Sequence, residues 1–203
     1  MVRRYYDRAD RESTINPFRC EGFLRDGAIP RRGGGSVALD TLPPFLRALL
    51  VTDGTVTKIL EAYFWEPVNV STQRQEFVTA EQPIPWVSVA PGDRVLVREA
   101  HLRGADRGTL YATAFSIIRT ELIPDTFRQR LIDREIGIGV LIRDSGLESY
   151  REVIEVDVTT VTDEDIDHEE LGTGDLLART YRIIIGREPV ILITEGFPVS
   201  RYR

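Results

Sequence analysis

One carboxylate interrupts the most apolar stretch of this chain, close to its C-terminal end. Residues 190–193 are all aliphatic, and Glu195 follows them after a single threonine. A carboxylate at the end of such a strand is costly to remove from water unless it is paired or takes part in chemistry. Glu195 is therefore the first candidate for a catalytic residue.

A second candidate is an arginine inside another apolar segment. Residues 95–97 read Val-Leu-Val, and Arg98 and Glu99 follow. Successive side chains of a strand point to opposite faces, so Arg98 faces away from Val97 and Glu99. Two interpretations stay open. Either Arg98 lies on the solvent side of a half-buried sheet, or its planar guanidinium points into a cavity and binds a carboxylate through two hydrogen bonds.

Two further patterns resemble ligand-binding loops. Gly137 and Gly139 flank Ile138, and glycines let the backbone amides of a loop approach a ligand closely. The segment lacks the pattern and the lysine of a phosphate-binding loop, so nucleotide binding is disfavoured. Alternating aspartates within residues 163–167 resemble a calcium loop, but the turn glycine and the terminal glutamate are missing. We therefore expect no metal site.

Composition excludes several other kinds of site. The chain has 203 residues, of which 42% are hydrophobic and 29% charged, and its net charge of −6 argues against general nucleic-acid binding. Cys20 is the only cysteine, which excludes an intrachain disulfide and a thiolate metal cluster. His101 and His168 are the only histidines, too few for a histidine-rich zinc site and poor support for a Ser-His-Asp triad. No apolar run approaches about 20 residues, and no hydrophobic signal core is present, so we expect a soluble, cytoplasmic protein without a membrane partner.

The sequence patterns around these residues predict strands and helices that together form an α+β fold. Strands are predicted at residues 68–78, 94–102, 109–118 and 150–159 and in a hairpin within 179–198, and helices at 40–50, 55–63 and 125–132. Asp40 or Thr41 would cap the first helix, and Thr55 would cap the second, so the two form a helical hairpin. Because the strands follow one another without regular βαβ alternation, we expect a single antiparallel sheet of about six strands with helices on one face.

Two parts of the chain differ from this pattern. Residues 1–38 are rich in Arg and Asp and read as an N-terminal extension that is partly flexible, with residues 39–203 forming the domain. The glycine run at 33–35 reads as a linker or a mobile loop. The acidic run at 162–170 is interpreted as a solvated helix or loop.

Taken together and in order, these patterns resemble the chorismate pyruvate-lyase family. The resemblance runs from residue 40 to the C-terminus, and the chain departs from the compact bacterial members in its N-terminal extension and its longer acidic insert. The motifs that carry it are Leu-x-x-Asp-Gly-x-x-Thr at 50–57, the strand pair Arg98-Glu99, the glycine-centred segment Ile138-Gly139 after a short helix, and the final hairpin with Arg-x-Tyr-Arg at 179–182 and Thr-Glu-x-Phe at 194–197.

The resemblance implies helical flaps over a buried ligand cavity and the conversion of chorismate to a hydroxybenzoate and pyruvate without a cofactor. It implies that Arg98 binds the ring carboxylate, together with the backbone at Ile138 before Gly139. Either the 3- or the 4-hydroxy product is compatible with the motifs, and the oligomeric state is not specified by them.

The remaining site residues also follow from the resemblance. Glu195 meets the hydroxyl end of the ligand and is the proposed acid, since apolar surroundings favour its protonated form. Because a neighbouring arginine would oppose that effect, Arg98 and Glu195 should lie at opposite ends of the ligand. Val56 belongs to the first flap and touches the ring, and Arg179 meets the side-chain carboxylate.

Two alternatives stay open. The scaffold could serve a cyclase or lyase of secondary metabolism that acts on another small molecule. It could also be a non-catalytic module that binds aromatic carboxylates, because the effector domains of some bacterial transcription regulators are similar in fold. The lack of a helix-turn-helix segment and the acidic balance count against a regulator.

Overall fold

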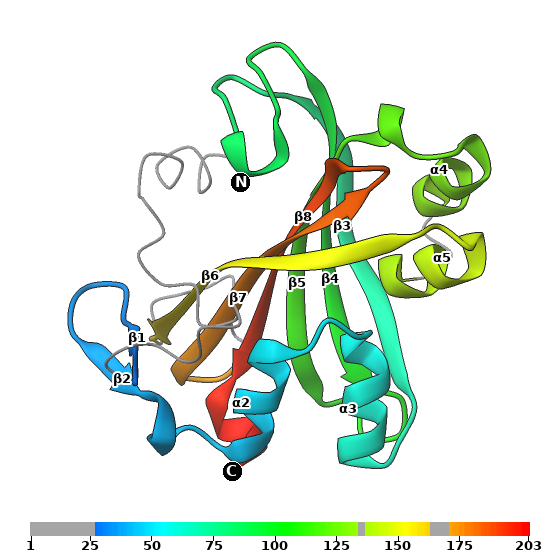
Figure 1. Cartoon of the computed structure of the whole chain (residues 1–203). Coiled ribbons are helices and arrows are strands. Elements are labelled where there is room, and N and C mark those ends of the chain that lie inside the picture. The colour runs from blue at the N-terminus through cyan, green and yellow to red at the C-terminus, as the bar shows by residue number, and fades with distance from the viewer. Residues whose placement is uncertain (1–26, 134–136, 163–170) are drawn as a thin grey trace.

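A six-stranded antiparallel sheet dominates the computed structural model, which describes residues 27–133, 137–162 and 171–203 (Figure 1). The strand order across the sheet is β3-β4-β5-β8-β7-β6. Its strands are β3 (Val68–Thr79), β4 (Arg94–Gly104), β5 (Leu110–Ile118), β6 (Ser149–Val161), β7 (Gly174–Ile185) and β8 (Glu188–Pro198). The predicted α+β fold with one antiparallel sheet of about six strands is confirmed.

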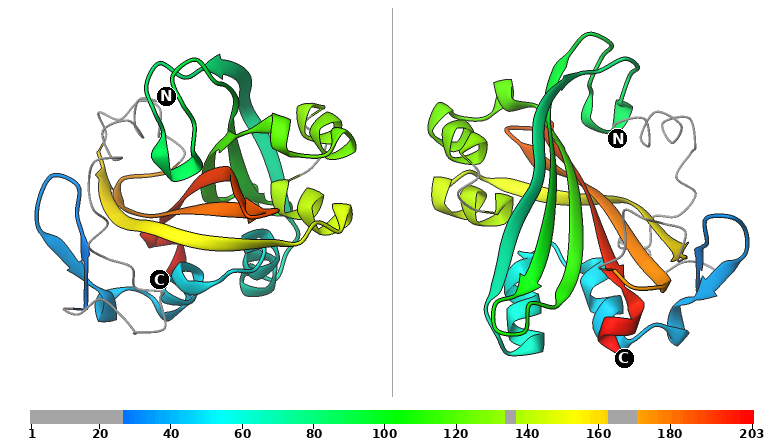
Figure 2. Two further views of the ribbon diagram at one scale, coloured as in Figure 1. Left: turned by 45° about the horizontal axis from the view of Figure 1, so that its top comes forward. Right: turned by 180° about the vertical axis from the view of Figure 1, so that it is seen from behind.

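Four α-helices in the described residues pack as two pairs. They are α2 (Pro44–Val51), α3 (Val56–Phe64), α4 (Asp125–Ile132) and α5 (Ile138–Ser145). Figure 1 shows α2 and α3 at the lower end of the sheet and α4 and α5 at its right-hand side. The sheet is strongly twisted, so that β6 runs across the direction of β4 and β5, as both views of Figure 2 confirm. No helix of the described residues is long and apolar enough to span a membrane.

Strand alternation gives the sheet two buried faces. One face packs against the segment between β3 and β4, through a cluster that includes Val95, Val97, Phe115, Ile117 and Leu192. The opposite face carries two separate clusters. One lies under α2 and α3 and includes Leu46, Leu49, Leu60 and Phe197, and the other lies under α4 and α5 and includes Phe127, Leu131, Leu141 and Ile191.

The start of the first helix differs from the prediction. Helix α2 begins at Pro44, and Pro43 occupies the N-cap position with φ −48° and ψ 136°. Asp40 and Thr41 belong to a separate 3₁₀ turn, Leu39–Thr41. A proline disfavours helical backbone in the residue before it, so the helix cannot extend back past Pro44. Thr55 is the N-cap residue of α3, as predicted, but its side chain makes no capping hydrogen bond.

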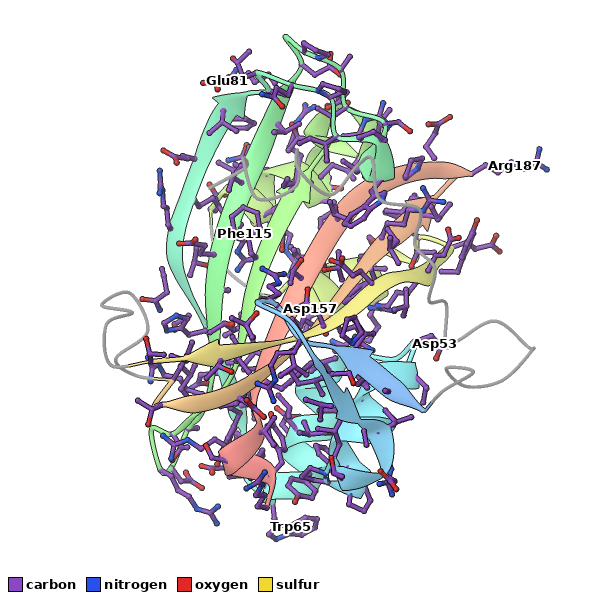
Figure 3. The ribbon with its side chains drawn as sticks, turned by 90° about the vertical axis from the view of Figure 1, so that its left-hand side faces the viewer. Asp53, Trp65, Glu81, Phe115, Asp157 and Arg187 are labelled. Carbon is purple, nitrogen blue, oxygen red and sulfur yellow. The ribbon has the colours of Figure 1, made fainter. Side chains whose placement is uncertain are left out.

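The glycine run is the turn of a small hairpin rather than a linker. Strands β1 (Ala28–Pro30) and β2 (Ser36–Ala38) pair antiparallel, and residues 33–35 all have positive φ values, which glycine adopts without strain. The hairpin is bound to the main sheet by ion pairs. Arg31 Nη1 and Nη2 donate to the two Asp175 carboxylate oxygens at 2.5 and 2.9 Å, and Arg32 Nη2 donates to Asp157 Oδ2 at 2.7 Å. Figure 3 shows Asp157 beside this hairpin.

Candidate active site

A cavity opens on the sheet face that carries the two helical pairs, between the clusters under each pair. Its empty volume is about 640 Å³, including open solvent at the mouth. Side chains of all six sheet strands line it, together with residues 54–57 at the start of α3 and 137–140 at the start of α5. The charged residues among this lining are Arg98, Arg151 and Glu195. A concave lining that is mostly apolar and carries a few polar and charged groups is typical of a small-molecule site.

Arg98 lies on the cavity face of β4 and is only 2% exposed. The interpretation that placed it on the solvent side of the sheet is therefore wrong. Its Nε and Nη2 atoms donate to Thr72 Oγ1 on β3 at 3.2 and 2.8 Å. On the other side it is paired in register with Ser116 of β5, which also lines the cavity. The hydrogen bonds to Thr72 on β3 thus hold the guanidinium at the cavity wall.

Glu195 lines the same cavity from β8 and is 6% exposed. Its Oε2 accepts a hydrogen bond from Arg179 Nη2 at 2.6 Å, and its Oε1 accepts one from the Tyr181 hydroxyl at 3.0 Å. Both carboxylate oxygens thus accept hydrogen bonds from protein donors, and one of these is also an ion pair with a buried arginine. The sequence predicts apolar surroundings for Glu195, and the structure instead gives it two polar partners.

Arg179 occupies a different position from the expected one. It is fully buried, and it is absent from the residues that line the cavity. Its Nη1 donates to the carbonyl oxygens of Leu49 and Thr52 at 2.5 and 2.8 Å, at the C-terminal end of α2. These carbonyls have no partner within their helix, and a cation is favourable there. Arg179 therefore connects Glu195 to the end of α2, the first helix of the flap formed by α2 and α3, and it does not line the cavity as expected of a ligand contact.

The segment around Ile138 and Gly139 is the first turn of α5, not a loop, and both residues line the cavity. The first amides of an α-helix have no partner within the helix, so the N–H groups of this turn can bind an anion. A Cβ atom built on Gly139 would lie 3.0 Å from Thr55 Cγ2 at the start of α3. Val56 follows Thr55, is buried and also lines the cavity. The starts of α3 and α5 thus meet at the cavity wall.

Two cavity residues carry functional groups that the sequence did not single out. Tyr181 is two residues from Arg179 on β7, so strand alternation places the two side chains on one face, and the pairing of Arg179 with Glu195 on β8 places Glu195 on the same face. Burial, together with the Glu195 charge, holds the pKa of Tyr181 well above its usual value, so the hydroxyl keeps its proton. Arg151 lies on β6 and donates from Nη1 to the Asp53 carbonyl oxygen at 2.5 Å. Nothing in its local sequence distinguishes it from a surface arginine.

Within the described ranges, no group of three or more His, Cys, Asp or Glu side chains could hold a metal ion. Cys20, His168 and the alternating aspartates at 163–167 lie outside the described residues.

Solved structures share this fold at low sequence identity. PhnF from Mycobacterium smegmatis superimposes with a TM-score of 0.57 at 12% identity, over 75% of this chain and 67% of that one. A transcriptional regulator of the GntR family from Bacillus cereus superimposes with a TM-score of 0.52 at 13% identity, over 67% of this chain and 94% of that one. At such identities the likeness extends to the fold alone.

Sequence comparison identifies a family. The chorismate pyruvate-lyase of Mycobacterium leprae (strain TN) is 31% identical over 156 residues, which cover 75% of this chain and 73% of that protein. The family model described as "Chorismate pyruvate-lyase Rv2949c-like" matches residues 50–203, which include helices α3, α4 and α5, the main sheet and all the residues that line the cavity. The chain therefore belongs to the Rv2949c-like chorismate pyruvate-lyase family.

Proposed function

We propose that this protein is a lyase that converts chorismate to a hydroxybenzoate and pyruvate without a cofactor. The observation that carries the proposal is that a buried guanidinium and a buried carboxylate, those of Arg98 and Glu195, line one cavity. Arg98 on β4 and Glu195 on β8 are separated by β5, and two strand spacings amount to about 10 Å. The two groups can therefore contact opposite ends of a six-membered ring and its substituents.

The chemistry of chorismate needs few protein groups. It is a cyclohexadiene with two carboxylates, one hydroxyl and an enolpyruvyl ether. When the C–O bond to the enolpyruvyl group and the C–H bond at the neighbouring ring carbon both break, the C–H electron pair completes an aromatic ring. Aromatisation makes the elimination strongly downhill. The protein must hold the dianion, exclude water and move one proton.

The ring carboxylate would be held at the Arg98 end of the cavity. A guanidinium binds a carboxylate through two parallel hydrogen bonds, and the first amides of α5 at Ile138 and Gly139 supply further donors in the same cavity. This arrangement would orient the ring so that its hydroxyl-bearing edge faces Glu195. Val56 would contact the ring from the first flap.

Glu195 would carry the proton. As a carboxylate it can accept the proton that leaves the ring carbon, and it can then deliver a proton to the departing enolpyruvate, which tautomerises to pyruvate. One proton leaves the ring and one joins the leaving group, so the protein returns to its starting state. Arg179 and Tyr181 would hold the carboxylate in position during both transfers. Acid–base assistance is worth about 10²–10⁴-fold, and positioning must supply much of the remainder.

Incubation of the purified protein with chorismate tests this proposal. Pyruvate release, coupled to NADH oxidation by lactate dehydrogenase, should match the formation of one aromatic product. Chromatography against 3- and 4-hydroxybenzoate standards then identifies the isomer. Absence of both pyruvate and an aromatic product above the protein-free rate would refute the reaction.

A second candidate is a binding module without turnover. It is favoured by one observation, the shared fold with the Bacillus cereus regulator. Tight binding of a hydroxybenzoate combined with no consumption of chorismate would support it. Consumption of chorismate without a hydroxybenzoate product would instead indicate a different reaction on the same scaffold.

A further inference from the structure

The cavity wall contains a second arginine that the proposed reaction has not used. Arg151 projects from β6, the strand at one edge of the sheet, whereas Arg98 belongs to β4 near the other edge. Four strand intervals separate them along the sheet. The sheet twists so strongly that β6 crosses the direction of β4 (Figure 2). The side chains of Arg98 and Arg151 nevertheless line one cavity.

Arg151 differs from the other arginines of this region in its partners. Arg179 is paired with Glu195, and Arg182 with Glu152, at N–O distances of 2.6 and 2.8 Å. No carboxylate among the described residues pairs with Arg151. Its one side-chain hydrogen bond within the described residues runs from Nη1 to the backbone carbonyl of Asp53, in the turn between α2 and α3. A guanidinium has five N–H donors, so most remain for a ligand.

The positive charge of Arg151 acts on another group of the cavity lining. It acts on the buried Tyr181 hydroxyl, whose pKa it lowers against the larger rise caused by burial. The described lining therefore offers two cationic groups, from Arg98 and Arg151, and one anionic group from Glu195. A ligand with two separate carboxylates and one neutral polar group complements this set.

We infer that Arg151 binds the second carboxylate of the ligand, so that the cavity selects dicarboxylates over monocarboxylates. This inference rests on the proposed function, in which Arg98 holds the ring carboxylate. Chorismate carries two carboxylates, and a hydroxybenzoate carries one. The substrate would contact both arginines, and the aromatic product would keep only the contact with Arg98. Once pyruvate has left, the contact with Arg151 is lost and the hydroxybenzoate is bound more weakly, which would help it to dissociate.

Two stable ligands that differ only in the second carboxylate test the inference. 3-(Carboxymethoxy)benzoate carries an ether-linked carboxylate, and 3-methoxybenzoate lacks it. Calorimetry at neutral pH and low salt should show that the wild-type protein prefers the dicarboxylate by about 10- to 100-fold, as expected for charge-assisted hydrogen bonds. Arg151→Gln should reduce this preference to less than about threefold and leave the affinity for 3-methoxybenzoate unchanged.

Arg182→Gln is the matched control, because it removes an arginine from the neighbouring strand β7 on the opposite face of the sheet, and it should keep the preference. The inference is overturned if Arg151→Gln keeps the preference, if the wild-type protein has none, or if Arg151→Gln weakens both ligands equally. The last result would mean that Arg151 serves only to hold the turn at Asp53.

Turnover separates this inference from the proposed reaction. If the dicarboxylate preference depends on Arg151 but chorismate yields no pyruvate, the reaction fails and the dicarboxylate site stands. If chorismate is consumed, Arg151→Gln should raise KM about 10- to 100-fold while the inhibition constant of the hydroxybenzoate product stays within about threefold. An unchanged KM would remove Arg151 from substrate binding and leave the reaction intact.

Discussion

Arg179 and Glu195 occupy paired positions on β7 and β8, and 2.6 Å separates Nη2 from Oε2. The same guanidinium donates through Nη1 to the carbonyl oxygens of Leu49 and Thr52. A cavity carboxylate is thereby connected, through one buried side chain, to the end of the helix that begins the first flap. The Arg179 guanidinium therefore helps to position both Glu195 and the C-terminal end of α2.

Glu195→Gln should lower kcat for pyruvate release by about 10²–10⁴-fold, because an amide cannot accept and return the proton. Hydroxybenzoate binding should persist within a few-fold, since the ring carboxylate is held at the other end of the cavity. Arg98→Gln should weaken both binding and turnover. The coupled pyruvate assay and calorimetry measure the two effects. Full activity in Glu195→Gln would remove this residue from the mechanism.

Arg179→Met should destabilise the fold by about 3–5 kcal/mol, because it leaves a buried carboxylate and two helix carbonyls without their partner. Urea unfolding followed by circular dichroism gives the change in free energy. Arg182→Gln removes a partly exposed ion pair three residues along the same strand, and we expect a loss of at most about 1 kcal/mol. Equal losses in the two variants would contradict the role assigned to Arg179.

Tyr181→Phe removes the hydroxyl that donates to Glu195 Oε1 and leaves the ring in place. We expect kcat to fall about tenfold with little change in hydroxybenzoate affinity, since one of two positioning hydrogen bonds is lost. Tyr150→Phe alters an exposed ring on β6 and should leave kcat unchanged. A Tyr181→Phe variant with the wild-type kcat, or with a loss of hydroxybenzoate affinity equal to its loss of kcat, would argue against positioning.

Gly139→Ala should disturb the contact between the two flaps, because the added Cβ would lie 3.0 Å from Thr55 Cγ2. We expect a three- to tenfold rise in KM with an unchanged fold by circular dichroism. Thr55→Ser removes that methyl group and should restore most of the loss in the double variant. If the double variant is no better than Gly139→Ala, the contact with Thr55 is not the cause.

Glu66 should make part of the stability depend on pH. The Tyr111 hydroxyl and the backbone N–H groups of Asp106 and Arg107 donate to its carboxylate, and they hold its pKa below 4.5. Because the pKa is lower in the folded state, the stabilisation is complete above about pH 4.5 and is lost as the pH falls through the folded value. Urea unfolding between pH 6 and 3 should show a shallower acid loss for Glu66→Gln than for the wild type. The exposed Glu121→Gln should retain the wild-type slope.

Much of the architecture follows from local sequence patterns. Alternating or continuous apolar runs bounded by turns predict all six strands of the main sheet, and the pattern after Pro124 predicts helix Asp125–Ile132 with the observed bounds. These succeed because strand and helix periods are local properties of the chain. The sequence does not predict the helix at Ile138–Ser145, because glycines at its N-cap, Gly137, and at its second residue, Gly139, are typical of a loop.

The sequence alone also determined which side chains were unusual, namely Arg98 and Glu195 as charges inside apolar strands. Only the tertiary structure decided their neighbours. The strand order brings Arg179 and Tyr181 onto Glu195, so Arg179 became a partner of the carboxylate rather than a ligand contact. The twist of the sheet brings Arg151 into the cavity from a distant strand. Pairing and twist arise from contacts between residues far apart in the chain, and no local pattern records them.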